Sequence, residues 1–331
     1  MTYRPQRIDV HHHFQPPEYI AELQRLGIHW TGGPPVPEWN LDIARETMDR
    51  TGIAQAMASV VPQVYWGDTA FAARWARHCN EFSASMVQQD PVHFGALATL
   101  PLPDTRAALK ELEYALDTLK LDGVIMFTSF GDQYPGDPAF EELFQELERR
   151  KAIVLIHPCT APPGAIVPKL NIPWGLTEFV FDTTRCVTNL LMTGTLARYP
   201  SIRYIVSHAG GTIPYIALRL KIGEEIPAFA ENIPLGTMHY LKKLYYDTTL
   251  STSDPVLAAL QQFVPTSQVL FGSDYPLVPE KVVKLETSML ESTRLLDDAT
   301  RQAIDRDNAL KLFPRFAAHA GASSRDAKTT A

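Results

Sequence analysis

The stretch Ile153-Val154-Leu155-Ile156-His157-Pro158 decides the fold that we expect for this chain. Four apolar residues in a row, rather than an alternation of apolar and polar ones, are typical of a strand that is buried on both faces. Tyr204-Ile205-Val206 repeats this pattern later in the chain. Strands of this kind belong to parallel sheets whose two faces are covered, so the two runs predict an α/β fold.

Such β-rich runs recur along the whole chain and are mostly separated by segments with helical periodicity. The eight runs are Arg7–Val10, Ile53–Val60, His93–Thr99, Gly123–Phe127, Ile153–His157, Arg203–Ser207, Leu244–Thr248 and Gln268–Gly272. The clearest helical patterns cover residues 104–120 and 138–150, where apolar side chains recur every three or four positions. This alternation predicts a (β/α)8 barrel of the TIM type that occupies residues 1–316 as one domain. A doubly wound sheet is the alternative, but no glycine fingerprint for a dinucleotide follows the first run.

Composition narrows the class of protein. The 331 residues carry a formal net charge of −7 and no long basic cluster, which disfavours nucleic acid as a partner. No apolar run is long enough to span a membrane, and the first residues lack the pattern of a signal peptide. The three cysteines, Cys79, Cys159 and Cys186, form no CxxC pair, which favours a reducing, cytoplasmic location. Residues 317–331 are small, polar and aperiodic, and we expect a disordered tail there.

Three consecutive histidines follow the first β-rich run, in Ile8-Asp9-Val10-His11-His12-His13-Phe14. Because side chains alternate between the two faces of an extended segment, His11 and His13 point the same way and His12 points the opposite way. Two neutral imidazoles on one face are suitable ligands for a divalent transition metal. A remnant of an affinity tag or a solvated histidine cluster is the alternative, but a tag would be longer and would not lie between Asp9 and Phe14 in a strand pattern.

Other polar side chains stand at the ends of later runs: His157 after the fifth, His208 after the sixth and Asp274 after the eighth. In a barrel these ends meet at one rim, where active sites lie. Taken singly, each residue has another reading, since His157 suits a cap, His208 a tight turn and Asp274 a helix N-cap. Together with His11 and His13 they predict a mixed nitrogen and oxygen coordination site.

Two long proline-rich loops, residues 30–39 and 158–174, are expected to lie over the same rim. They place aromatic side chains beside the predicted site. Trp39, Trp174 and Phe179 are expected either to wall a pocket for an aromatic ring or to pack within a lid.

Motifs of a known family stand at these positions. The chain resembles the amidohydrolase superfamily, in particular the amidohydrolase-2 branch that contains aminocarboxymuconate-semialdehyde decarboxylase and aromatic-acid decarboxylases. The Asp182-Thr183-Thr184-Arg185 stretch, together with Pro37-Glu38-Trp39, is most similar to the 6-methylsalicylate decarboxylase subgroup. The motifs that carry the family resemblance are Ile8–His13, Ile156–Pro158, Ser207–Gly211, Phe271–Pro276 and Asn308–Phe313.

The resemblance implies a role for each matching residue. His11, His13, His157 and Asp274 would bind one divalent ion, zinc or manganese, and His208 would be the catalytic base or acid. Arg219 would bind the substrate carboxylate, in some members across a dimer, so the resemblance implies a homodimer or a higher homo-oligomer. Phe127-Thr128-Ser129 contains no lysine at the end of the fourth run, which disfavours a binuclear site. Arg185 is either a second carboxylate contact or an ordinary helix residue.

The function that we expect is that of a carboxy-lyase. A metal ion without any organic cofactor would support non-oxidative decarboxylation of a small aromatic, salicylate-type, or unsaturated carboxylic acid, with His208 or Asp274 as the proton donor. The alternative on the same ligands is metal-dependent hydrolysis of a lactone or an amide. A purely structural metal site is disfavoured, because it would not need His208 and Arg219 at the rim.

Overall fold

The computed structural model describes residues 5–28, 37–160 and 171–319, and its centre is a parallel sheet of eight strands. Neighbours in the chain are neighbours in the sheet, and every recorded pairing is parallel. The predicted (β/α)8 barrel is therefore confirmed. Its strands are β1 Arg7–Phe14, β2 Ile53–Val60, β3 Phe94–Thr99, β4 Gly123–Phe127, β5 Ile153–His157, β6 Arg203–Val206, β7 Tyr245–Asp247 and β8 Val269–Leu270.

Backbone hydrogen bonds between β1 and the segment that follows β8 close the barrel. The Val10 N–H donates to the Phe271 carbonyl at 3.0 Å, and the Asp274 N–H donates to the His11 carbonyl at 2.7 Å. Strand β1 therefore has partners on both sides, which explains why it continues to Phe14 instead of ending at Val10 as predicted. The histidines lie inside this strand and not after it.

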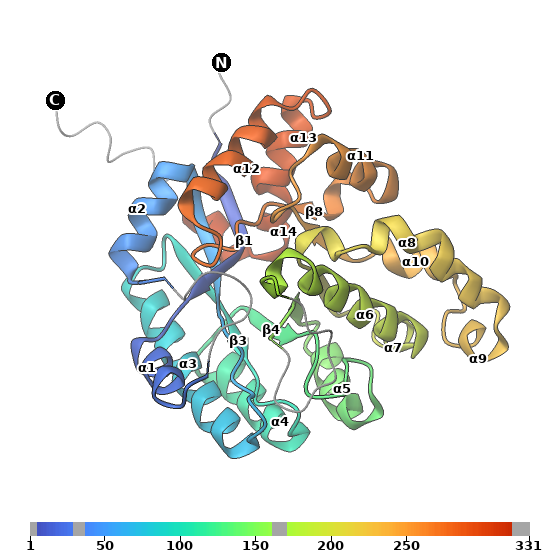
Figure 1. The fold of residues 1–331 in the computed structure, drawn as a ribbon, viewed down its shortest axis with the longest axis horizontal. Coiled ribbons are helices and arrows are strands. Elements are labelled where there is room, and N and C mark those ends of the chain that lie inside the picture. The colour runs from blue at the N-terminus through green and yellow to red at the C-terminus, as the bar shows by residue number, and fades with distance from the viewer. Residues whose placement is uncertain (1–4, 29–36, 161–170, 320–331) are drawn as a thin grey trace.

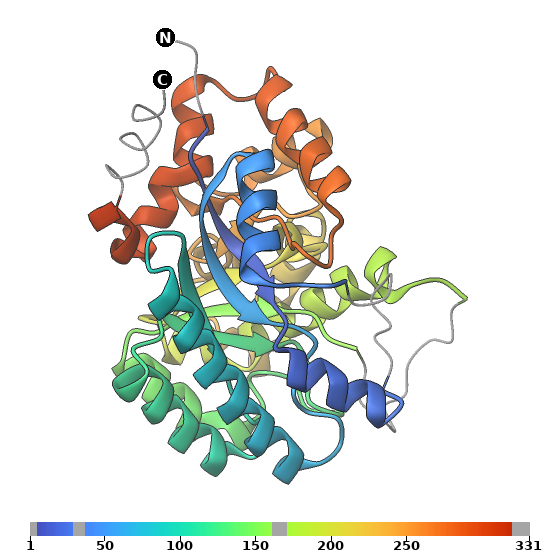
Figure 2. The ribbon, with the colours of Figure 1, turned by 90° about the vertical axis from the view of Figure 1, so that its left-hand side faces the viewer.

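Helices surround the strands, as Figure 1 shows. They are α1 Pro17–Arg25, α2 Leu41–Thr51, α3 Thr69–Gln89, α4 Thr105–Glu113, α5 Glu141–Arg149, α6 Glu178–Met192, α7 Thr195–Arg198, α8 Ile213–Leu220, α9 Pro227–Ala230, α10 Thr237–Leu241, α11 Asp254–Phe263, α12 Glu280–Ser292, α13 Asp298–Gln302 and α14 Asn308–Leu312. Helix α2 packs against β2 with α12 beside it, and Figure 2 shows α2 lying across the barrel wall. Helices α8 and α9 project from one side of the barrel (Figure 1).

The predicted helices form with altered ends. The pattern over residues 104–120 becomes α4, whose first turn is capped by the Asp104 carboxylate, followed by a π-helical turn at Tyr114–Thr118. The pattern over 138–150 becomes a 3₁₀ turn at Pro138–Phe140 and then α5. A 3₁₀ helix at Pro314–His319 includes the first three residues of the predicted tail, and residues 320–331 lie outside the described residues.

Strands β4 and β5 are buried at every position, as expected for strands covered on both faces. All three cysteines are buried and free of disulfides. None of the helices in the described ranges combines the length and the apolar character that a bilayer crossing requires.

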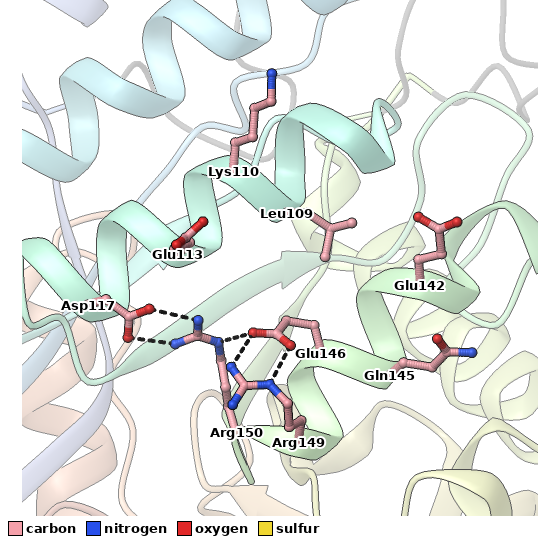
Figure 3. A pocket seen from close by; sticks show the side chains of 9 residues that line it. All are labelled: Leu109, Lys110, Glu113, Asp117, Glu142, Gln145, Glu146, Arg149 and Arg150. Carbon is pink, nitrogen blue, oxygen red and sulfur yellow. Dashed lines mark hydrogen bonds and ion pairs between the residues drawn. The ribbon is translucent and has the colours of Figure 1, made fainter.

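A charged groove of about 750 Å³ runs between α4 and α5 on the outside of the barrel (Figure 3). The Arg150 guanidinium crosses it and binds the Asp117 carboxylate through two nitrogens at 2.7 and 2.8 Å. Glu146 accepts hydrogen bonds from both Arg149 and Arg150 (Figure 3). These charges neutralise one another within the helix layer, whereas the polar residues predicted to be functional lie at the barrel rim.

Candidate metal centre and active site

Three strands bring four predicted ligands to one point inside the barrel. His11 and His13 lie on β1, His157 ends β5, and Asp274 follows β8. All four side chains are buried, and one ligand atom from each lies within 4.8 Å of the others. The structure thus assembles the coordination site that the sequence predicts from residues up to 263 positions apart (274 − 11).

The atoms that face one another in this cluster have no hydrogen-bond partner in the part of the chain that the structure describes. They are Nε2 of His11, His13 and His157, and Oδ1 of Asp274. Asp274 Oδ1 lies 2.8 Å from His13 Nε2 and 3.4 Å from His11 Nε2, in ion-pair contacts that lack hydrogen-bond alignment. Buried polar atoms are nearly always satisfied, so such convergence indicates a ligand that all four share. Three imidazole nitrogens and one carboxylate oxygen fit a zinc or manganese ion.

The opposite nitrogen of each imidazole is anchored, which orients the ring. His11 Nδ1 donates to Asp247 Oδ2 at 2.7 Å, and His157 Nδ1 donates to the Pro158 carbonyl at 2.6 Å. His13 Nδ1 lies 3.2 Å from the Ser59 carbonyl, which can only accept. With Nδ1–H engaged in this way, Nε2 is the nitrogen of each ring that is left to bind a metal ion in its deprotonated form.

Asp247 is a site residue that the sequence analysis missed. It ends β7 and is completely buried. Besides its contact with His11, its Oδ1 accepts hydrogen bonds from the backbone N–H groups of His208 and Thr249, at 2.9 and 3.1 Å. One carboxylate therefore positions a predicted ligand and a predicted catalytic residue together. The available signal was a carboxylate near the end of the β-rich run Leu244–Thr248.

Electrostatic coupling within the cluster appears in its pKa values. Burial and the neighbouring imidazoles lower the pKa of His157 to about 3. Burial alone would raise the pKa of Asp274, but the charge of His11 and the close contacts with the imidazoles hold it well below its ordinary value. Burial likewise opposes protonation of His11, yet Asp247 and Asp274 raise its pKa to about 10. A metal ion at His11 must therefore displace a proton.

His208 stands beside the four-residue cluster in the turn after β6. Its Nε2 lies 3.7 Å from Asp274 Oδ2, and its Nδ1 has no hydrogen-bond partner. The backbone of His208 has a φ of 55°, a strained conformation that is common at functional sites. Gly211 follows with φ +64°, and a Cβ atom there would collide with the Val180 carbonyl. The Gly-Gly turn thus lets α6 approach closely while the imidazole faces the cluster.

The two arginines predicted to contact the substrate carboxylate are exposed, whereas the four predicted metal ligands are buried. Arg219 is exposed on α8, and no ion pair or hydrogen bond joins it to the cluster among the described residues. Arg185, on α6, is 52% exposed and lies 3.9 Å from Glu178 Oε2. His12 is buried on the other face of β1, as predicted, and its Nδ1 lies 3.0 Å from Asp9 Oδ2.

The structure also describes the three aromatic residues that were expected to wall a pocket or to pack within a lid. Trp39 and Phe179 are buried, whereas Trp174 is partly buried in a 3₁₀ turn. The ring of Trp39 packs on Phe14 and on Phe82 of α3. Residues 30–36 and 161–170 of the two predicted loops lie outside the described residues.

A second polar cluster joins the end of β4 to α6. Asp182 accepts hydrogen bonds from the Thr128 hydroxyl and from the Tyr134 hydroxyl, the latter at 2.6 Å. Burial raises the pKa of Asp182. Thr128 follows β4, and its N–H donates to the His157 carbonyl at 3.0 Å, so this cluster adjoins the candidate metal centre.

One more buried carboxyl lies near the site. Glu286, on α12, is 5% exposed. Burial, together with the charges of Asp274 and Asp247, raises its pKa to about 8, although the Leu250 backbone N–H opposes this shift. The Glu286 carboxyl is therefore mainly neutral at pH 7 and adds little negative charge to the site.

Comparison with known proteins identifies the family of this chain. Residues 8–315 match the amidohydrolase family model Amidohydro_2, and the chain belongs to this family. The chain is 36% identical, over 319 residues, to 6-methylsalicylic acid decarboxylase of Penicillium expansum, which covers 94% of this chain and 97% of that protein. The resemblance that the sequence motifs indicated is confirmed.

Solved structures share the barrel. A protein described as an amidohydrolase II matches with a TM-score of 0.87 at 30% identity, over 93% of this chain and 99% of that one. The 5-carboxyvanillate decarboxylase of Novosphingobium aromaticivorans, solved with manganese and 4-hydroxy-3-methoxy-5-nitrobenzoic acid, has a TM-score of 0.82 at 22% identity. That match covers 94% of this chain and 96% of the decarboxylase.

Proposed function

We propose that this protein is a metal-dependent, non-oxidative decarboxylase of a small aromatic acid of the salicylate type. The observation that carries this proposal is the convergence of four unpartnered ligand atoms beside His208 in a family member that is 36% identical to a 6-methylsalicylic acid decarboxylase. The catalytic unit is one domain over residues 1–316. The three buried free cysteines suit a reducing cytoplasm.

His11, His13, His157 and Asp274 hold one divalent ion, zinc or manganese. The ligand atoms support either metal, and a structural neighbour that contains manganese favours that ion. When bound, the ion would supply Lewis acidity to the substrate carboxylate. Asp247, Ser59 and the Pro158 carbonyl orient the three imidazoles toward it.

His208 and Asp274 are the candidate residues for transferring a proton to the substrate. His208 Nε2 lies 3.7 Å from Asp274 Oδ2, beyond hydrogen-bond distance, so the imidazole faces the ligand cluster and is placed to carry the proton to the substrate. Delivery of that proton to the ring carbon that bears the carboxylate forms a carbon–hydrogen bond. The carbon–carbon bond then breaks, its electron pair restores the aromatic ring, and CO2 leaves. Overall, one carboxylate and one proton become one arene and one CO2.

Hydrolysis of a lactone or an amide would use the same ligands. Sequence similarity favours decarboxylation, because the chain is 36% identical to the 6-methylsalicylic acid decarboxylase of Penicillium expansum. We therefore assign carbon–carbon cleavage to this site and treat hydrolysis as the outcome that would overturn it.

The reaction itself is tested with salicylate and its 6-methyl derivative in heavy water. Protein loaded with manganese or zinc is expected to release CO2 and to place one deuterium on the carbon that lost it. Added nicotinamide or pyridoxal cofactors should change nothing, and carboxylation of the product should appear at high bicarbonate. If such acids are untouched while lactones or amides open with incorporation of oxygen from water, the protein is a hydrolase.

Arg219 binds the substrate carboxylate from a second copy of the chain. The support is its exposed position on α8, beside the side chains of Tyr215 and Leu218, which are 90% and 81% exposed. Large apolar side chains that project in this way are typical of surfaces that pair with another protein. Helices α8 and α9 also stand out from the barrel, where a partner copy can reach them (Figure 1).

Subunit mixing tests this arrangement. Arg219→Ala protein and His208→Asn protein should each be nearly inactive, because each lacks one group that every site needs. A mixture should regain activity after subunit exchange, since one site of each hybrid dimer is intact. Light scattering of the separate variants controls for assembly. Lack of recovery after confirmed exchange would mean that Arg219 acts within its own subunit or not at all.

A further inference from the structure

Gln15 has a buried side-chain amide near the rim of the barrel, and none of the contacts described above involves it. It follows directly after β1 and is 3% exposed. Neither its Nε2 nor its Oε1 has a hydrogen-bond partner within residues 5–28, 37–160 and 171–319. A buried amide without partners is costly, and an unsatisfied group in a native protein needs a specific reason.

Gln15 directly follows the last residue of β1, and we infer its direction by continuing the alternation of the strand by one residue. The Phe14 ring lies 5.8 Å from the ring of Phe82 on α3, so Phe14 faces the helix layer outside the barrel. His13 faces the metal cluster on the inner side, and Gln15 shares that parity. Residues two apart on a strand are separated by about 6.8 Å, so Gln15 stands one step above His13, toward the mouth of the barrel.

The charge of the proposed substrate explains why an amide would be placed there. A carboxylate in a buried site needs donors in addition to the metal ion. The buried arginine and lysine side chains of the described residues are Arg7 and Arg301. Arg7 pairs with Asp305 at the start of β1, and Arg301 donates to carbonyls of Leu290 and Leu296, so neither is free at the rim. Besides the Arg219 that we propose a second copy supplies, Gln15 offers N–H groups there that have no partner among the described residues of its own chain.

We propose that Gln15 is a substrate-binding residue whose side-chain N–H donates to a carboxylate oxygen of the bound aromatic acid. This inference rests on the proposed decarboxylase function and names a further residue that selects the substrate. The Gln15 amide stays unsatisfied in the free protein, and binding of the acid relieves that cost. Affinity is thus obtained at the expense of the stability of the free protein.

The test combines binding, turnover and stability. Gln15→Met keeps the length of the side chain and removes both polar atoms. The binding probe is 3-methyl-2-nitrophenol, in which a nitro group replaces the carboxylate of the methylsalicylate substrate and cannot leave as CO2. We expect the Michaelis constant for the substrate to increase about 10- to 100-fold, as for loss of a hydrogen bond to a charged group, and the dissociation constant of the probe, whose nitro group is neutral, to increase by a smaller factor. The Tm of the free, metal-loaded protein should stay the same or rise, because an unsatisfied buried group is gone.

Gln55 provides the matched control. It is a buried glutamine on β2 whose Nε2 donates to the Val92 carbonyl at 3.1 Å. Gln55→Met should lower the Tm, since it leaves a carbonyl without its donor, and should leave both constants unchanged. Gln15→Glu is the second variant: it preserves shape but replaces the donor by an oxygen, so it should weaken binding at least as much as Gln15→Met.

The results of these experiments distinguish a failure of the Gln15 assignment from a failure of the proposed decarboxylase function. If wild-type protein decarboxylates the methylsalicylate while Gln15→Met and Gln15→Glu bind substrate and probe as the wild type does, the assignment of Gln15 is wrong and the function stands. A lowered Tm of Gln15→Met with unchanged affinity would likewise identify a structural amide. If wild-type protein releases no CO2 but binds the nitrophenol in a Gln15-dependent way, the decarboxylase function fails and the binding role holds.

Discussion

Replacing His157 by alanine is expected to strip the divalent ion from the protein and to abolish turnover. Nε2 of His157 is one of four converging atoms without another partner, so no other side chain takes its place. Loss of an outer partner of a metal ligand already costs about 10- to 100-fold in affinity or activity, and loss of the ligand itself should cost more. His11→Ala should have the same effect. The measurement is metal content per chain after dialysis, about one ion in the wild type and near zero in the variants.

A histidine elsewhere serves as the control for this experiment. His239 is exposed on α10, so His239→Ala should retain the metal ion and the activity. Asp247→Asn should retain a metal content between those of His157→Ala and His239→Ala, because it removes an anchor of His11 but no ligand atom. Full occupancy in both His157→Ala and His11→Ala would reject this coordination set.

The pH dependence of metal binding has a definite sign. Asp247 and Asp274 raise the pKa of His11 to about 10, so in the metal-free protein this imidazole holds a proton throughout the neutral range. A metal ion must displace that proton, and proton competition weakens as the pH rises. Metal titration at pH 6 and pH 8 should therefore show tighter binding at pH 8.

His208→Asn is expected to keep the fold and the metal ion while lowering turnover by at least about a hundredfold. General acid–base catalysis by one side chain contributes about 10²- to 10⁴-fold, and His208 Nε2 faces Asp274 without being one of the four ligand atoms. Asparagine is the appropriate replacement, because it tolerates the left-handed backbone at this position. Turnover of the methylsalicylate is measured together with metal content and circular dichroism.

The pH profile distinguishes a catalytic His208 from a structural one. If His208 holds the transferred proton, the residual activity of His208→Asn should lose one limb of the wild-type profile. A structural role would instead lower activity and thermal stability together and leave the shape of the profile unchanged. Wild-type turnover in His208→Asn would contradict the assignment.

The barrel and the four ligand positions were predictable from the sequence, because both depend on local patterns. Continuous apolar runs such as Ile153–Ile156 identify buried parallel strands, and such strands with helical connections close into a barrel. Once the strands are parallel, their carboxyl ends share one rim. His157 and Asp274 were therefore predicted to meet His11 and His13 without knowledge of any distance.

Tertiary structure alone decided how those ligands are supported. Asp247 lies 2.7 Å from His11 although 236 positions separate them, and nothing local to residue 247 identifies that partner. The length of β1 depended on backbone pairing with residues after β8, and the burial of Gln15 without partners depended on packing around the whole rim. Arg219 is exposed because α8 turns it outward, which helical periodicity alone did not reveal. A sequence pattern specifies the direction and period of each element, whereas contacts across the barrel arise only when distant elements pack together.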